Sequence, residues 1–92
     1  WDKIYFTNNS ESHIQNAIFS WATNPLNFFS NSVIENIIIT NSNYYALHVE
    51  TSSIEASNIT FYHNLNGCFF SSQTNSNLQS TINKSLFINN SD

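Results

Sequence analysis

Apolar and polar residues alternate in short segments that recur along the chain. Pairs of apolar residues separated by one position, such as Ile37 with Ile39 and Ile59 with Phe61, mark these segments. Side chains two residues apart in a strand share one face, so the alternation predicts β-strands with one buried face. No apolar stripe with helical spacing persists, and β-branched and aromatic residues are plentiful while Ala, Leu, Glu and Lys are scarce. The pattern therefore predicts an all-β fold.

The segments repeat, which is the signature of a solenoid. Four of them resemble one another, and each contributes one large apolar anchor: Phe6, Ile39, Phe61 and Phe87. Further short apolar segments precede and follow the anchors, which gives three short strands in each coil. We therefore predict that residues 1–92 form a single segment of right-handed parallel β-helix with about three to four coils. The divergent stretch 20–32 is interpreted as a loop excursion from the first coil.

A polar residue stands two positions after each anchor: Asn8, Asn41, His63 and Asn89. By the alternation of a strand, this position shares the inward face of the anchor. A buried polar group must be hydrogen-bonded, and stacked amides satisfy this condition because each offers both donors and acceptors. We therefore predict an inward column of hydrogen-bonded polar side chains at this bend.

The composition favours a folded chain over a disordered one. The 17 Asn and 15 Ser together make up 32 of 92 residues, as in low-complexity tracts, yet 40% of the residues are hydrophobic and 15% aromatic. A chain with that apolar content can bury a core. Gly and Pro occur once each, so Asn, which tolerates left-handed backbone, is expected to make the turns.

Two motifs carry a family resemblance. Phe6-Thr7-Asn8 and Phe87-Ile88-Asn89 resemble the repeats of the pectate-lyase-like right-handed β-helix superfamily. The Asn- and Ser-rich style is similar to that of surface repeat proteins of eukaryotes with AT-rich genomes. The resemblance implies an architecture and not an activity, because the superfamily includes polysaccharide lyases and hydrolases, phage tailspikes, adhesins and passive scaffolds.

Few residues suggest catalysis. Lyases of this superfamily use an Arg base and acidic calcium ligands on neighbouring coils, whereas this chain has no Arg and its acidic residues do not repeat in register. Glu50 and Glu55 lie around a bend, so they are interpreted as solvated charges and not as a hydrolytic pair. His13, His48 and His63 have no spacing typical of a metal site. The sequence thus predicts no enzyme, no metal and no cofactor.

Charge and hydropathy limit the partners. A net charge of −4 disfavours nucleic acid, and no apolar run approaches the roughly 20 residues that cross a bilayer, so neither nucleic-acid binding nor membrane insertion is expected. The single Cys68 excludes an internal disulfide; it is either a partly buried apolar residue or a reactive or intermolecular thiol. Solenoid edges expose apolar surface, so we expect further coils of the same chain or other copies stacked end to end.

Four Asn-x-Ser/Thr sequons begin at Asn8, Asn58, Asn83 and Asn89. Asn8 and Asn89 belong to the predicted inward column and are expected to be bare. Asn58 precedes an inward residue and should point outward, whereas Asn83 lies near a bend, where the alternation does not fix its direction. Asn58 is therefore the first predicted site of an N-linked glycan and Asn83 the second. In a cytosolic or bacterial protein the sequons would instead be coincidental, as the abundance of Asn and Ser allows.

These observations predict a non-catalytic structural or adhesive component of an extracellular or cell-surface assembly, such as a coat or filament. The alternative is a carbohydrate-binding or carbohydrate-active β-helix whose active coils lie outside this segment. Exposed aromatics such as Tyr44, Tyr45 and Tyr62 are suited to stacking on sugar rings, which supports the alternative. Aligned Asp and Arg residues on adjacent coils would distinguish it from the first hypothesis.

Overall fold

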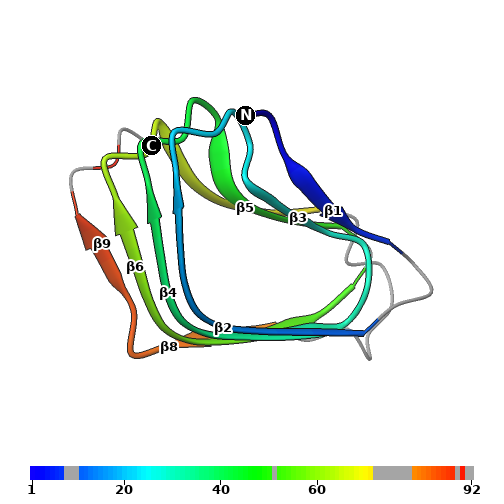
Figure 1. Ribbon diagram of the computed structural model, residues 1–92. Helices are drawn as coiled ribbons and strands as arrows, with labels where there is room; N and C mark the ends of the chain where they lie inside the picture. Colours follow the sequence, from blue (N-terminus) through cyan, green and yellow to red (C-terminus); the bar gives the residue numbers. More distant parts are fainter. Residues whose placement is uncertain (8–10, 51, 72–79, 89, 91–92) are drawn as a thin grey trace.

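The computed structural model describes residues 1–7, 11–50, 52–71, 80–88 and 90, which form a parallel β-solenoid of about three turns (Figure 1). One sheet contains four strands in the order β1 (Ile4–Phe6), β3 (Leu26–Phe28), β5 (Tyr45–Glu50) and β7 (Asn66–Ser71). The other contains β2 (Ser12–Ser20), β4 (Ser32–Thr40), β6 (Ile54–Tyr62) and β8 (Thr81–Asn83), with β9 (Leu86–Ile88) also paired to β6. All of these pairings are parallel, so the predicted parallel β-helix is confirmed.

Left-handed backbone at repeated positions divides each coil into legs. The strands β2, β4 and β6 bend partway along their length (Figure 1), where Asn16, Asn36 and Asn58 have φ angles of 56°, 56° and 55°. Lys84, between β8 and β9, has a φ of 53° at the equivalent position. Asn adopts this conformation more readily than most residues, so the chain turns without glycine, as the composition predicts. No helix among the described residues is long and apolar enough to cross a membrane.

Inward side chains from both sheets fill the solenoid. Ile37, Ile39, Ile59 and Phe61 are each at most 1% exposed, which confirms the predicted alternation in β4 and β6. The register pairs Ile39 with Phe61, so like positions lie above one another in columns. The column continues with Phe87, whose ring stacks on Phe61 with centroids 4.5 Å apart and planes at 7°. Complete burial of one such side chain contributes about 1.5–3 kcal/mol.

The first coil differs from the prediction. Phe6 pairs with Phe28 in the sheet of β1 and β3, whereas Phe19 is the residue that pairs with Ile39. The anchor of the first coil is therefore Phe19, and Phe6 belongs to a separate column on another leg. Every leg carries apolar residues at alternate positions, so the local pattern does not distinguish one leg from the next.

The stretch 20–32 is not a loop excursion. It contains the last residue of β2, the turn that follows, the whole of β3 and the first residue of β4, so it is a regular part of the solenoid. Leu26 and Phe28 are fully buried, and Asn27 between them is buried with its amide bonded to two backbone carbonyls. An anchor at Phe6 makes the predicted first coil too long, and the excess residues then resemble a loop.

Candidate functional site

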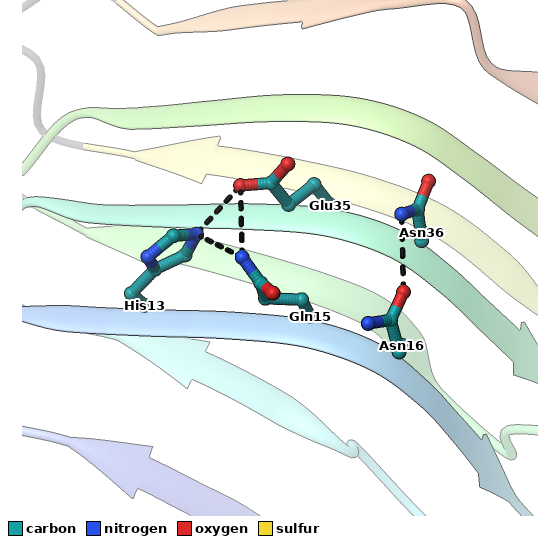
Figure 2. A network of polar contacts seen from close by, with 5 residues as sticks. All are labelled: His13, Gln15, Asn16, Glu35 and Asn36. Atoms are coloured by element: carbon teal, nitrogen blue, oxygen red, sulfur yellow. Dashed lines mark hydrogen bonds and ion pairs between the residues drawn. The ribbon is translucent and has the colours of Figure 1, made fainter.

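A polar network lies on the outer face of β2 and β4 (Figure 2). The parallel register places Gln15 beside Glu35, and His13 lies on the same face two residues before Gln15. His13 Nε2 is 2.6 Å from Glu35 Oε1, while Gln15 Nε2 lies 3.1 Å from the same ring nitrogen and donates to Glu35 Oε1 at 3.4 Å. A carboxylate only accepts hydrogen bonds, so the contact with Glu35 corresponds to the tautomer in which His13 Nε2–H donates, and the Gln15 amide then donates to Glu35 and not to the ring nitrogen. The network thereby joins two successive coils.

This network is solvated. The side chains of His13 and Glu35 are 54% and 35% exposed, so their contact contributes at most about 1 kcal/mol. A groove of about 480 Å³ opens beside it and bears the carboxylates of Glu11 and Glu55, which disfavour anionic ligands. Among the described residues, no cluster of three His, Cys, Asp or Glu side chains is placed to hold a metal ion. The groove lining is Glu11, Ser12, His13, Asn31, Ser32, Val33, Ser53, Ile54 and Glu55.

The bend in the long strands carries an outward column of asparagines. Asn36 Nδ2 donates to Asn16 Oδ1 at 3.0 Å, a bond drawn in Figure 2, and Asn58 Nδ2 donates to Asn36 Oδ1 at 2.6 Å. All three residues are exposed, so water is available to replace either bond. We call Asn16, Asn36 and Asn58 the outer asparagine column.

The predicted inward polar column lies one residue further along the chain. Asn41 is half-buried and His63 is exposed, and both have left-handed backbone, with φ angles of 57° and 55°. A left-handed residue interrupts the alternation of the strand, so the residue after it points inward. Those following residues are Ser42 and Asn64, which are 3% and 1% exposed. The assignment of Asn41 and His63 to the interior is therefore wrong.

Two inward asparagines each hold the turn of the preceding coil. Asn64 Oδ1 accepts from the backbone N and the Oγ of Ser42 at 3.0 and 2.8 Å, and Asn64 Nδ2 donates to Ile39 O at 2.9 Å. Asn90 repeats this arrangement one coil later. Its Oδ1 accepts from Asn64 N at 2.9 Å, and its Nδ2 donates to Phe61 O at 2.9 Å. We call Ser42, Asn64 and Asn90 the inner polar column.

The two predicted glycosylation sites, Asn58 and Asn83, are exposed. Asn58 belongs to the outer asparagine column, and Asn83 is the last residue of β8. Asn8 and Asn89, which were predicted to be inward and bare, lie outside the described residues.

Cys68 is a half-buried thiol on β7 that packs against the core. Burial raises the pKa of this thiol to about 12. The thiolate is the reactive form of cysteine, so an environment that suppresses it favours the interpretation of Cys68 as an apolar packing residue.

The aromatics suggested for sugar stacking lie in two places. Tyr44 and Tyr45, around the start of β5, contact each other with ring centroids 4.4 Å apart. Tyr62, at the end of β6, stacks on the imidazole of His63 at 3.9 Å with planes at 15°. Tyr44 and Tyr62 are 49% and 39% exposed, so each presents ring surface to solvent.

Comparison of the chain with protein-family models, with curated proteins and with solved structures gives no match. A functional assignment therefore depends on the geometry of the molecule.

Proposed function

We propose that this chain is a non-catalytic structural or adhesive segment of an extracellular assembly, in which coils stack end to end. Its repeats resemble those of the pectate-lyase-like β-helices, and the proposal places it with the scaffolds and adhesins of that superfamily and not with its enzymes.

The observation that carries the proposal is the exposure of the last apolar side chain in the core column at one edge of the solenoid. Phe87 is 55% exposed although its ring continues the column of Ile39 and Phe61, both of which are fully buried. At the opposite edge, the equivalent Phe19 is half-buried. Another coil placed against Phe87 would bury its ring as Phe87 buries Phe61, which contributes about 1.5–3 kcal/mol for complete burial.

The backbone supports the same proposal. The strands β1 and β7 are the outer members of their sheet, and β9 pairs with β6 on one side. A strand at the edge of a sheet presents N–H and C=O groups that favour pairing with another strand. The partner is a further coil, supplied by the same polypeptide or by another copy.

The extracellular location is supported by the placement of the sequons. Asn58 and Asn83 are both exposed, so an attached N-linked glycan would project into solvent without displacing core residues.

Sedimentation velocity of residues 1–92 over a range of concentrations tests the proposal. We expect species larger than a monomer to grow with concentration, because association buries the exposed edges. Phe87→Asp should abolish the association, since it places a charge where the next coil packs. Leu86→Asp is the matched control, because Leu86 is 59% exposed on the same strand but faces outward. With both variants shown to be folded by circular dichroism, a monodisperse parent protein at every concentration would contradict the proposal.

A further inference from the structure

The turns after β2, β4 and β6 lie one above another at the corner that follows these long strands (Figure 1). Backbone bonds align them, because Asn43 N donates to Ala22 O at 2.9 Å and Leu65 N donates to Ser42 O at 3.0 Å. A shallow, open depression of about 310 Å³ lies at these turns. We call it the corner notch, and its lining is Trp21, Asn41, Ser42, Asn43, His63, Asn64 and Leu65.

The difference in side-chain size between successive turns creates the notch. The middle turn contributes Asn41 and Asn43 to the lining, and we call these two residues the floor. The turn before it presents Trp21, which is 73% exposed, and the turn after it presents Leu65, which is 49% exposed, together with His63. Backbones two coils apart are separated by about 9.6 Å. Two stacking contacts of about 3.5–4 Å need about 7–8 Å, so the spacing is wide enough for one ring to lie between the two outer turns.

Trp21 is an unusual residue for its position. Its φ is 61°, in the left-handed region that costs about 1–2 kcal/mol for a residue with a side chain. At the same position in the next coil, Asn41 adopts this conformation readily. The Trp21 ring gains little burial in return, so packing does not account for it. A large exposed ring held on strained backbone indicates a binding role.

We propose that the corner notch binds a neutral pyranose ring of a glycan. The indole face of Trp21 stacks on the C–H face of the sugar. The side chains of Asn41 and Asn43 make no hydrogen bond to another described residue. Their amides therefore donate to and accept from the hydroxyl groups of the sugar. The lining contains no Asp, Glu, Lys or Arg, and the net charge of the chain is −4, so rings that bear a carboxylate are disfavoured.

The corner notch is independent of the proposed stacking of coils. It is formed by three turns inside the segment, and none of its lining residues belongs to β1, β7 or β9. A glycan site here would give the segment an adhesive function whether or not its edges associate.

Tryptophan fluorescence provides the direct test. The chain has two Trp residues, so in a Trp1→Phe protein Trp21 is the only indole reporter. This protein is titrated with cellotetraose, maltotetraose and chitotriose, and with trigalacturonate as the acidic comparison, up to about 10 mM to reach weak affinities. We expect a saturable change in emission with at least one neutral oligosaccharide, together with shifts of the Asn41 and Asn43 side-chain amides in nitrogen–proton NMR spectra. No saturable change with any of the three, or tighter binding of trigalacturonate, would overturn the proposal.

Variants then assign the binding to the notch. In saturation-transfer NMR of the bound sugar, Trp21→Ala should weaken binding at least about tenfold. Asn43→Ala, on the exposed floor, should weaken it less, and Trp21→Phe should retain part of the affinity. Ile18→Ala is the matched control, because Ile18 is 69% exposed on the outer face of β2 and outside the notch. Equal affinities of the parent protein and both alanine variants in the notch would also overturn the proposal.

Discussion

Asparagines occupy two corners of the same coil, and the two corners use them in opposite ways. In the outer asparagine column, the asparagine is itself the left-handed residue, and Asn36 is exposed and bonds to the side chains of its neighbours. In the inner polar column, the left-handed residue comes first. Asn64 behind it is 1% exposed, and its amide bonds to two backbone groups of the preceding turn as well as to the side chains of Ser42 and Asn90. An asparagine at the left-handed position therefore points to the surface, whereas an asparagine one residue later points into the core.

The two columns also differ in how much their hydrogen bonds contribute to the free energy of unfolding. A hydrogen bond between exposed side chains is in competition with water, and its net contribution is small. A buried amide that satisfies backbone groups has no such substitute, because its loss leaves those groups desolvated and unpaired. We therefore expect the inner polar column to contribute much more to stability than the outer asparagine column.

The largest expected effect is that of Asn64→Ala. The change leaves the Ser42 N–H, the Ser42 hydroxyl and the Ile39 carbonyl without the amide that pairs with them, so we expect a loss of about 2–4 kcal/mol in the free energy of unfolding. Urea denaturation followed by circular dichroism measures it. A loss below about 1 kcal/mol would show that water enters the turn and replaces the amide.

The second-largest expected effect is the pH dependence of stability that arises from the thiol of Cys68, which packs against the core. Burial raises the pKa of this thiol from 9.0 to about 12, so the folded state holds the proton more tightly than the unfolded state. The stabilisation is complete below the unfolded pKa and is lost as the pH rises from about 9 toward 12. One unit above the unfolded pKa, the loss is on the order of 1 kcal/mol.

Cys68→Ala isolates this contribution from those of all other groups in the chain. The measurement is the difference in unfolding free energy between the parent and Cys68→Ala at pH 8 and at pH 10. We expect the parent to lose more stability than the variant over this interval. Parallel losses in the two proteins would show that the thiol is not the group responsible.

The strands and the stacking were predictable from sequence, but the register at the corners was not. The alternation of Ile37 with Ile39 and of Ile59 with Phe61 is a short-range signal, and it survives in the structure. The anchor of the first coil was misplaced because all legs share this alternation. The sequence does not reveal the inner polar column, because the inward and outward alternation of a strand does not continue past a left-handed residue. The signal was present as a second polar residue, in Asn41-Ser42 and His63-Asn64.

The candidate sites were predictable to different degrees. The exposure of Asn58 followed from its place before an inward isoleucine, a relation between neighbours in the chain. The corner notch depends on residues from three turns that are far apart in sequence, and Trp21 lay in the stretch that was assigned to a loop. Its recognition required the correct stacking of the turns.

The third effect concerns the left-handed backbone of the outer asparagine column. Asn36→Gly removes both side-chain hydrogen bonds but keeps a residue that adopts the left-handed conformation freely, so we expect a loss of at most about 1 kcal/mol. Asn36→Ala removes the same bonds and adds a backbone cost of about 1–2 kcal/mol. Thermal unfolding of the two variants should therefore rank glycine as more stable than alanine. The reverse order would show that this corner does not need the left-handed conformation.

The smallest expected effect on stability is that of a glycan at Asn58, and it distinguishes the two columns chemically. An asparagine amide has two N–H bonds, and Asn58 uses Nδ2 to donate to Asn36 Oδ1. The bond to the sugar replaces the other N–H bond, so Asn58 can carry a glycan and still donate to Asn36. If the protein passes through a eukaryotic secretory pathway, Asn58 should carry a glycan, with Asn83 second. Mass spectrometry of native material before and after enzymatic deglycosylation measures the occupancy. Thr60→Ala, which destroys the sequon of Asn58 and leaves Asn58 in place, should remove one glycan while changing the unfolding free energy by less than about 1 kcal/mol. Bare Asn58 and Asn83 in native material would leave the solenoid intact and remove the main support for an extracellular location.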